Sequence, residues 1–173
     1  MTEQSDAGTA GEDQRCVAAL RTLAAGELKS WHGLPDRCAL QDAETAFGPS
    51  DPGPNGSAML GGALTEFRRF PPTSFAPYGI VVWLEEGEII TVEIVEPHLP
   101  APIQDQLGAP EAETPSALAA FHTQLIYATR GLALHVHQFR STVFRLYAFP
   151  PTTVADFLAS PLAGVATQRT PRF

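Results

Sequence analysis

The sequence has few of the features that indicate a function. Its 173 residues include one lysine, Lys29, and two cysteines, Cys16 and Cys38. The formal net charge of −8 argues against a general nucleic-acid-binding protein, which needs cationic side chains to displace counterions from phosphate. No stretch approaches the roughly 20 apolar residues of a membrane-spanning helix, and residues 1–15 lack the apolar core of a secretory signal. These absences predict a cytoplasmic protein with no membrane segment.

The motifs that bind nucleotides or carry common hydrolytic chemistry are also missing. The chain contains no G-x-x-x-x-G-K-S/T, G-x-G-x-x-G, G-x-S-x-G or H-E-x-x-H. A nucleotide-dependent enzyme is therefore disfavoured, and no cofactor is predicted. In the cytoplasm Cys16 and Cys38 are expected to be reduced thiols, and a disulfide between them is expected only if the protein is exported.

One pattern occurs twice along the chain. Residues 78–95 and 130–147 each open an alternating apolar run at a glycine, Gly79 or Gly131, reverse through a short polar turn and return as a second alternating run. Alternation with a period of two is typical of strands. The pattern predicts an α+β fold of two tandem helix-plus-antiparallel-sheet units that share a one-sided core.

The predicted boundaries follow from the breaks between these patterns. We expect a disordered tail over 1–12, a first unit over 13–97, a second unit over 98–165 and a tail over 166–173. Within the first unit we expect helices over 13–29 and 35–47, a strand over 60–70 and a hairpin over 79–96. Within the second we expect a short helix over 99–107, a linker over 111–116, strands over 121–129, 132–139 and 142–149, and a short helix ending at Leu158 that Thr152 or Thr153 caps.

Aligning Gly79 with Gly131 separates the two faces of the predicted sheet. The apolar positions agree, with Ile80 matching Leu132 and Ile94 matching Leu146. The other face carries polar and aromatic residues, and the candidate binding residues on it are Trp83, Glu85, Glu93, His135, His137, Arg145 and Tyr147. This alternation predicts a sheet with one packed face and one face presented outwards.

His135 and His137 are the most specific local feature. Histidines two residues apart on a strand point to the same side, about 6.5–7 Å apart along the backbone, so both could bind one metal ion. The sequence names no third ligand, although His122, Glu85 and Glu93 are available. A metal site, a binding or acid–base role without metal, and two exposed histidines all remain open, and no metal is predicted.

A smaller basic and aromatic patch lies at Phe67, Arg68, Arg69 and Phe70. Arginines beside aromatic rings can hold a phosphate or a carboxylate. In so acidic a chain we expect them instead to pair with Glu66, Glu93 or other carboxylates.

The order of elements resembles a known family. The predicted helices are followed by Gly48-Pro49 in the first unit and by Gly108 with Pro110 in the second, and the strands open at Gly79 and Gly131. This order resembles the β-lactamase-inhibitor-protein and BamE-like fold over about residues 34–149. The resemblance implies a short helical pair packed against an antiparallel sheet. Inhibitor-type members carry two tandem units whose sheets form a concave, protein-binding surface. No functional residue is carried over from the family.

Two functions are compatible with these observations. The first is a non-enzymatic cytoplasmic binding module that presents the polar-aromatic sheet face to a protein partner, since arginine and aromatic residues dominate interface energetics. The alternative is a small-molecule enzyme or ligand carrier with a pocket between sheet and helices, and with His135 or His137 as acid–base groups or metal ligands. An open face favours the first, and a closed pocket where a histidine meets a carboxylate favours the second.

Overall fold

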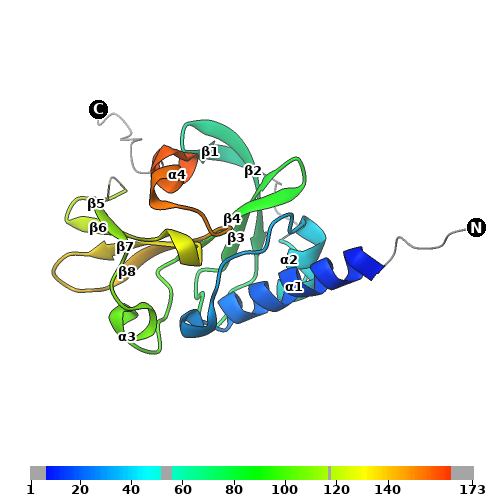
Figure 1. Ribbon diagram of the computed structural model, residues 1–173, viewed down its shortest axis with the longest axis horizontal. Coiled ribbons are helices and arrows are strands. Elements are labelled where there is room, and N and C mark those ends of the chain that lie inside the picture. The colour runs from blue at the N-terminus through cyan, green and yellow to red at the C-terminus, as the bar shows by residue number, and fades with distance from the viewer. Residues whose placement is uncertain (1–6, 52–55, 117, 165–173) are drawn as a thin grey trace, which may run out of the picture.

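The structure is a computed structural model that describes residues 7–51, 56–116 and 118–164 (Figure 1). Its helical segments are α1 (Ala7–Ala24), η1 (Leu28–Ser30), α2 (Leu40–Phe47), α3 (Ile103–Leu107), η2 (Ala128–Arg130), α4 (Val154–Ala159) and α5 (Pro161–Gly164), where η marks a 3-10 turn. Its strands are β1 (Ser57–Leu60), β2 (Ala63–Phe70), β3 (Ile80–Glu85), β4 (Glu88–Val95), β5 (Ala112–Pro115), β6 (His122–Tyr127), β7 (Leu132–His137) and β8 (Val143–Ala148). The predicted α+β class is confirmed.

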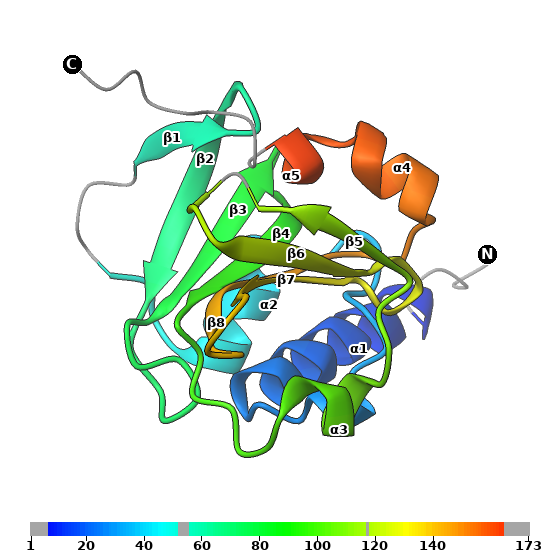
Figure 2. The ribbon, with the colours of Figure 1, turned by 90° about the vertical axis from the view of Figure 1, so that its left-hand side faces the viewer.

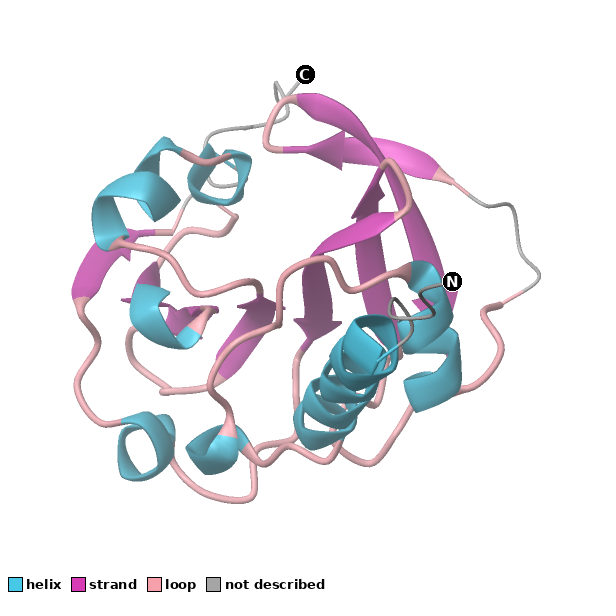
Figure 3. Ribbon diagram, turned by 45° about the vertical axis from the view of Figure 1, so that its right-hand side comes forward, coloured by secondary structure: helices cyan, strands magenta, loops and turns pink. Residues whose placement is uncertain are grey.

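The eight strands of the described residues belong to one antiparallel sheet in the order β1-β2-β3-β4-β8-β7-β6-β5. The order describes two four-stranded meanders, β1–β4 and β5–β8, which join where their last strands pair. Figure 3 shows the strands as one twisted sheet with helices on both of its sides. The predicted hairpin and the three strands of the second half are therefore present.

The two halves meet at equivalent positions, but their hairpins are not identical. Ile94 lies directly opposite Leu146 across β4 and β8, and the sequence pattern equates the same two residues. Ile80 faces Ile94 in the first hairpin, whereas Leu132 faces Ala148 in the second. The second hairpin is thus offset by two residues. Because an offset of two keeps every side chain on its original face, the predicted division into two faces still holds.

The glycines that open the two patterns are required by the backbone. Gly79 has a φ of +88° and Gly131 a φ of +61°, both in the left-handed region that side chains disfavour. A Cβ at Gly79 would lie 2.7 Å from the carbonyl oxygen of Phe70, and one at Gly131 only 2.0 Å from that of Phe149. These close approaches explain why both strands begin at a glycine.

Hydrophobic residues pack on both faces of the sheet. The larger cluster joins α1, α2 and α3 to the expected apolar positions, among them Leu20, Leu23, Ile80 and Leu134. A second, smaller cluster on the opposite face joins Phe157 of α4 to residues of β6, β7 and β8. Figure 2 shows α1–α3 on one side of the sheet and α4 and α5 on the other. The polar face is therefore partly covered, although the sequence predicted it to point outwards.

Several boundaries differ from the prediction. α1 begins at Ala7, so residues 7–12 are helical and only 1–6 of the predicted tail lie outside the described residues. The predicted linker contains β5, and the predicted strand over 60–70 covers β2, which forms a hairpin with β1. α2 starts at Leu40, because Ala39 bridges to β4 and its N–H donates to the Asp42 carboxylate at 2.8 Å, which caps the helix. The whole predicted C-terminal tail, 166–173, lies outside the described residues.

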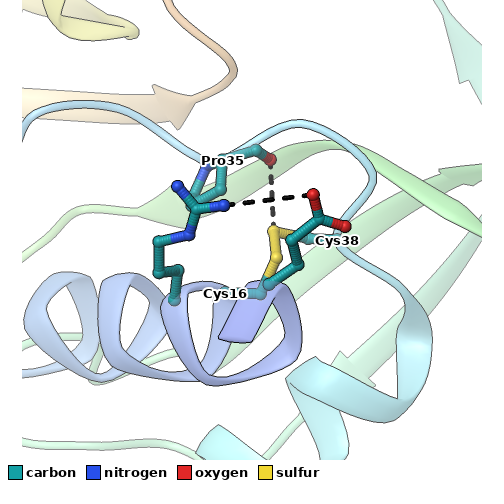
Figure 4. Close-up of polar contacts among 5 residues, drawn as sticks. Cys16, Pro35 and Cys38 are labelled. Carbon is teal, nitrogen blue, oxygen red and sulfur yellow. Dashed lines mark hydrogen bonds and ion pairs between the residues drawn. A yellow bond between two sulfur atoms is a disulfide. The ribbon is translucent and has the colours of Figure 1, made fainter. Parts of the chain in front are cut away.

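Cys16 and Cys38 form a disulfide, so the prediction of two reduced thiols is wrong for this structure (Figure 4). The bond joins α1 to the segment before α2, with a Cα–Cα distance of 5.5 Å. Both residues are buried within the larger core, and the Cys38 sulfur lies 3.2 Å from the carbonyl oxygen of Pro35. The sequence pattern said nothing of their proximity.

Candidate functional site

A buried polar network lies on the face that the sequence singled out. The indole N–H of Trp83 donates to Oε2 of Glu93 at 2.8 Å, and the Arg145 guanidinium forms an ion pair with Oε1 of the same carboxylate. Tyr147 lies opposite Glu93 across β4 and β8, where Glu93 and Arg145 both act on its hydroxyl. Strands β3, β4 and β8 thus bring four of the seven predicted residues into one group, which we call the Glu93 network.

This network is held away from water. Glu93 is 4% exposed, and Trp83 and Tyr147 are also buried. Burial raises the pKa of the Tyr147 phenol, and the Glu93 carboxylate adds to the rise, whereas Arg145 opposes it. Tyr147 therefore stays neutral and keeps its hydrogen as a donor. Both Glu93 oxygens accept bonds, so the carboxylate holds the group together.

His135 is sealed inside the protein beside this network. Its Nδ1 lies 2.7 Å from the Ser116 hydroxyl and its Nε2 lies 3.4 Å from the Gln124 amide nitrogen, and no part of the residue is exposed. Burial lowers its pKa to about 4, with smaller contributions from Arg145 and His122. A neutral imidazole with both nitrogens engaged inside the core is not positioned to act as an acid–base group or metal ligand near neutral pH.

The lowered pKa of His135 predicts a loss of stability in mild acid. The unfolded chain takes up this proton near pH 6.5 and the folded chain near pH 4, so stability is complete above the first value and falls between the two. The loss should approach about 3 kcal/mol of unfolding free energy at the acid end. Denaturant unfolding at neutral and mildly acidic pH measures it. His135→Gln should flatten this part of the pH profile, and His32→Gln, at an exposed histidine, should leave it unchanged.

His137 and Glu85 lie away from the Glu93 network. His137 faces His122 across β6 and β7, and their ring centroids are 5.0 Å apart in an edge-to-face arrangement. Glu85 is exposed at the end of β3, beside Asp36 and Arg37. The seven predicted binding residues therefore lie in three places. Four form the Glu93 network with His135 beside it, His137 pairs with His122, and Glu85 is exposed at the end of β3.

An open cleft of about 1040 Å³, which we call the first cleft, lies over β2, β3, β4 and β8. It contains three of the predicted residues, Trp83, Glu93 and Arg145. Its walls add residues that the sequence reasoning did not assign to a site, namely Phe67, Arg69, Tyr78, Val81 and Val95. The period-two alternation of β2 could have identified Phe67 and Arg69, since both share a sheet face with Trp83.

The arginines of the Phe67–Phe70 patch have different partners. Arg68 forms an ion pair with Glu66 at 2.6 Å, as expected. Arg69 instead lies over the Phe67 ring, 5.4 Å from its centroid, and is exposed at the cleft. Glu93, the other expected partner, is taken by Arg145. One arginine of the patch is therefore presented to the first cleft.

Potential metal ligands come together at one place in the described ranges. Cys16, Cys38 and Asp42 have ligand atoms within 4.8 Å of one another. The two sulfurs are joined in the disulfide and offer no thiolate, and Asp42 caps α2. His135 and His137 belong to no such group among these residues.

Comparison with known proteins adds little to this picture. No family model and no curated protein sequence matches the chain. A crystal structure of a DUF4309 family protein, YjgB from Bacillus subtilis, aligns with a TM-score of 0.48 and 14% identity, covering 79% of this chain and 99% of that one. Within the described part of the chain, none of the helices combines the length and apolar character needed to cross a bilayer.

Proposed function

We propose that the protein is a non-enzymatic binding module that holds an extended segment of a protein partner in the first cleft. The observation that carries the proposal is the composition of this cleft. Trp83, Glu93 and the half-buried Arg145 form a fixed floor between aromatic and proline walls, and the cleft above this floor is open to solvent. Arginine and aromatic residues in such positions contribute most of the energy at protein interfaces.

The charges of the cleft indicate the partner's chemistry. Arg69 is exposed at its wall beside Asp51, and Arg145, which is paired with Glu93, contributes a second guanidinium. Val81 and Val95 provide half-buried apolar surface between them. A segment with apolar side chains and an acidic side chain directed at Arg69 complements this arrangement.

The residues singled out from the sequence form no catalytic pair in this cleft, which favours binding over chemistry. Its described lining contains no histidine and no cysteine, and the Glu93 carboxylate is fully engaged. The histidine nearest this network, His135, is inaccessible. A general acid or base must reach the proton it transfers, and neither the engaged Glu93 nor the buried His135 is positioned to do so.

Selection of peptides from a random displayed library on the immobilised full chain tests the proposal. Recovered peptides should combine apolar and acidic residues, and binding should change the fluorescence of Trp83. Arg69→Gln and Tyr78→Ser should each weaken binding by about tenfold, as expected for a contact worth 1–2 kcal/mol. Leu64→Ser, at an exposed apolar residue outside the cleft, is the matched control.

Two outcomes would contradict the binding proposal. In the first, no peptide is enriched above a denatured-protein control. In the second, the enriched peptides bind the Tyr78→Ser and Arg69→Gln variants as tightly as the unaltered chain, which would place their site elsewhere.

The compartment belongs to this proposal as well. The cytoplasmic location indicated by the sequence stays a prediction, and the Cys16–Cys38 disulfide argues against it, because cytosolic reductants keep most protein thiols reduced. We infer that the module works in oxidising surroundings, where this cross-link persists.

A further inference from the structure

A second cleft, of about 850 Å³, lies at the end of β6, β7 and β8 and extends to the loops before β3 and after β4. It contains three of the chain's five histidines, His98, His122 and His137, together with Arg140 and a single carboxylate, Glu96. In a chain with a net charge of −8 this is a local concentration of groups that are cationic or can become so. The surplus favours an anionic ligand.

Hydrogen bonds fix different proton positions on the paired histidines. The Phe139 N–H donates to Nδ1 of His137 at 3.2 Å, which leaves Nε2 as the nitrogen that carries the proton in the neutral ring. Nδ1 of His122 donates to the Ala120 carbonyl oxygen at 2.9 Å, which leaves a lone pair on its Nε2. His137 is therefore a donor even when uncharged, and either ring becomes a double donor on protonation.

This arrangement fits an anion better than a metal ion. A metal shared by the pair needs a lone pair from each imidazole, and the bond from Phe139 already occupies the lone pair of His137. A carboxylate or phosphate oxygen instead needs N–H donors, which His137 supplies.

The turn between β7 and β8 holds a further cation beside the pair. The His137 N–H donates to the Thr142 carbonyl oxygen at 2.9 Å, and the Ser141 N–H donates to the His137 carbonyl oxygen at 3.0 Å. Ser141 has a φ of +51°, a left-handed conformation that closes the turn at some cost in strain. Arg140 is exposed in this turn and forms no ion pair within the described residues.

From these observations we propose that the second cleft binds a small anionic group, a carboxylate or a phosphate, through His137 and Arg140. His122 adds a donor when it is protonated. The guanidinium can donate to two anion oxygens at once, and the histidine donor fixes the side from which the anion approaches. The site is separate from the Glu93 network, and its occupation does not require a partner in the first cleft.

Titration of the full chain with inorganic phosphate and, in a separate arm, with acetate tests this proposal. Histidine ring NMR signals are followed at constant pH and ionic strength, with sodium chloride as the reference. We expect a saturable change at His137 and His122 in at least one arm, and the arm that saturates identifies the anion. Arg140→Gln and His137→Gln should each weaken binding by about tenfold or more, since each removes a charge-assisted or fixed donor. Arg15→Gln, at an exposed arginine on α1, should bind like the unaltered chain.

Three results would overturn the inference. One is a linear change in both arms that chloride reproduces. Another is unaltered affinity in both the Arg140→Gln and His137→Gln variants. The third is saturation by zinc chloride with none by either anion, which would make the pair a metal site. Because none of these readouts depends on Trp83 fluorescence or on selected peptides, failure here leaves the proposed function standing, and the reverse is also true.

Discussion

Glu93→Ala should lower the free energy of unfolding by about 3–5 kcal/mol, the largest effect that we expect from a single substitution in this protein. Glu93 is 4% exposed and accepts from Trp83 and Arg145. Without it, a partly buried guanidinium loses its counter-ion and a buried indole N–H loses its acceptor. Uncompensated buried charges and donors are far more costly than the net value of the intact pair. Equilibrium denaturation in urea measures the change.

The pair Arg68–Glu66 provides the matched control. The Glu66 side chain is 44% exposed, compared with 5% for Glu93, although both carboxylates bind an arginine on the same sheet. Glu66→Ala should therefore cost only about 0–1 kcal/mol, the usual range where the carboxylate of an ion pair is exposed to water. A similar small loss in Glu93→Ala would show that water reaches the network and that its groups are not buried in solution.

A double variant separates the charge from the packing. Glu93→Met with Arg145→Met removes both charges together and should recover much of the stability that Glu93→Ala loses, since apolar replacement of a buried pair is often neutral or better. The same double variant should lose the binding attributed to the first cleft, because Arg145 forms part of its floor. The double variant would then be more stable than Glu93→Ala and yet fail to bind the partner. A purely structural role for the network predicts instead that binding recovers with stability.

Local sequence patterns were sufficient to predict much of the sheet. Glu86 and Gly87 both adopt positive φ at the β3–β4 reversal, where the sequence placed a hairpin turn, and the flanking alternation set the paired strands. β5 was missed because it is a four-residue edge strand ending at Pro115, with neither length nor an apolar face to reveal it. Helix at 7–12 was missed because small polar residues show no apolar period there.

The candidate site was predicted less completely, and for a different reason. Alternation correctly placed Trp83, Glu93 and Tyr147 on one face. It did not show that this face is covered, because polar residues alternate along a strand with a period of two whether the face is covered or exposed. The covering elements come from distant sequence, with Phe157 of α4 packing against the cluster that contains Tyr147, and Ser116 bonding to His135. Whether a strand residue is covered depends on such long-range contacts, which a single sequence does not reveal.

Replacement of Cys16 and Cys38 by serine should lower the free energy of unfolding by about 3 kcal/mol. The cross-link spans 22 residues, and closing a loop of that length removes a corresponding share of chain entropy from the unfolded state. For a chain of this size the loss corresponds to about 6–12 °C in melting temperature. Thermal unfolding of the Cys16→Ser/Cys38→Ser variant measures it, with Ser30→Ala, at an exposed residue outside the cross-link's contacts, as a control for a neutral substitution.

Reduction of the unaltered chain must give the same shift if the disulfide is the cause. A phosphine reductant should lower its melting temperature to that of the double serine variant and leave the variant itself unchanged. The intact mass of protein purified in air should be lower by two hydrogens than that of the reduced chain. Two titratable thiols in the native protein, or a melting temperature that the reductant does not alter, would contradict the cross-link. Such a result would also restore the prediction of a reducing compartment, because two buried thiols in the core are compatible with the cytoplasm. The redox state of this pair thus decides both the stability of the fold and the compartment in which the first cleft would meet its partner.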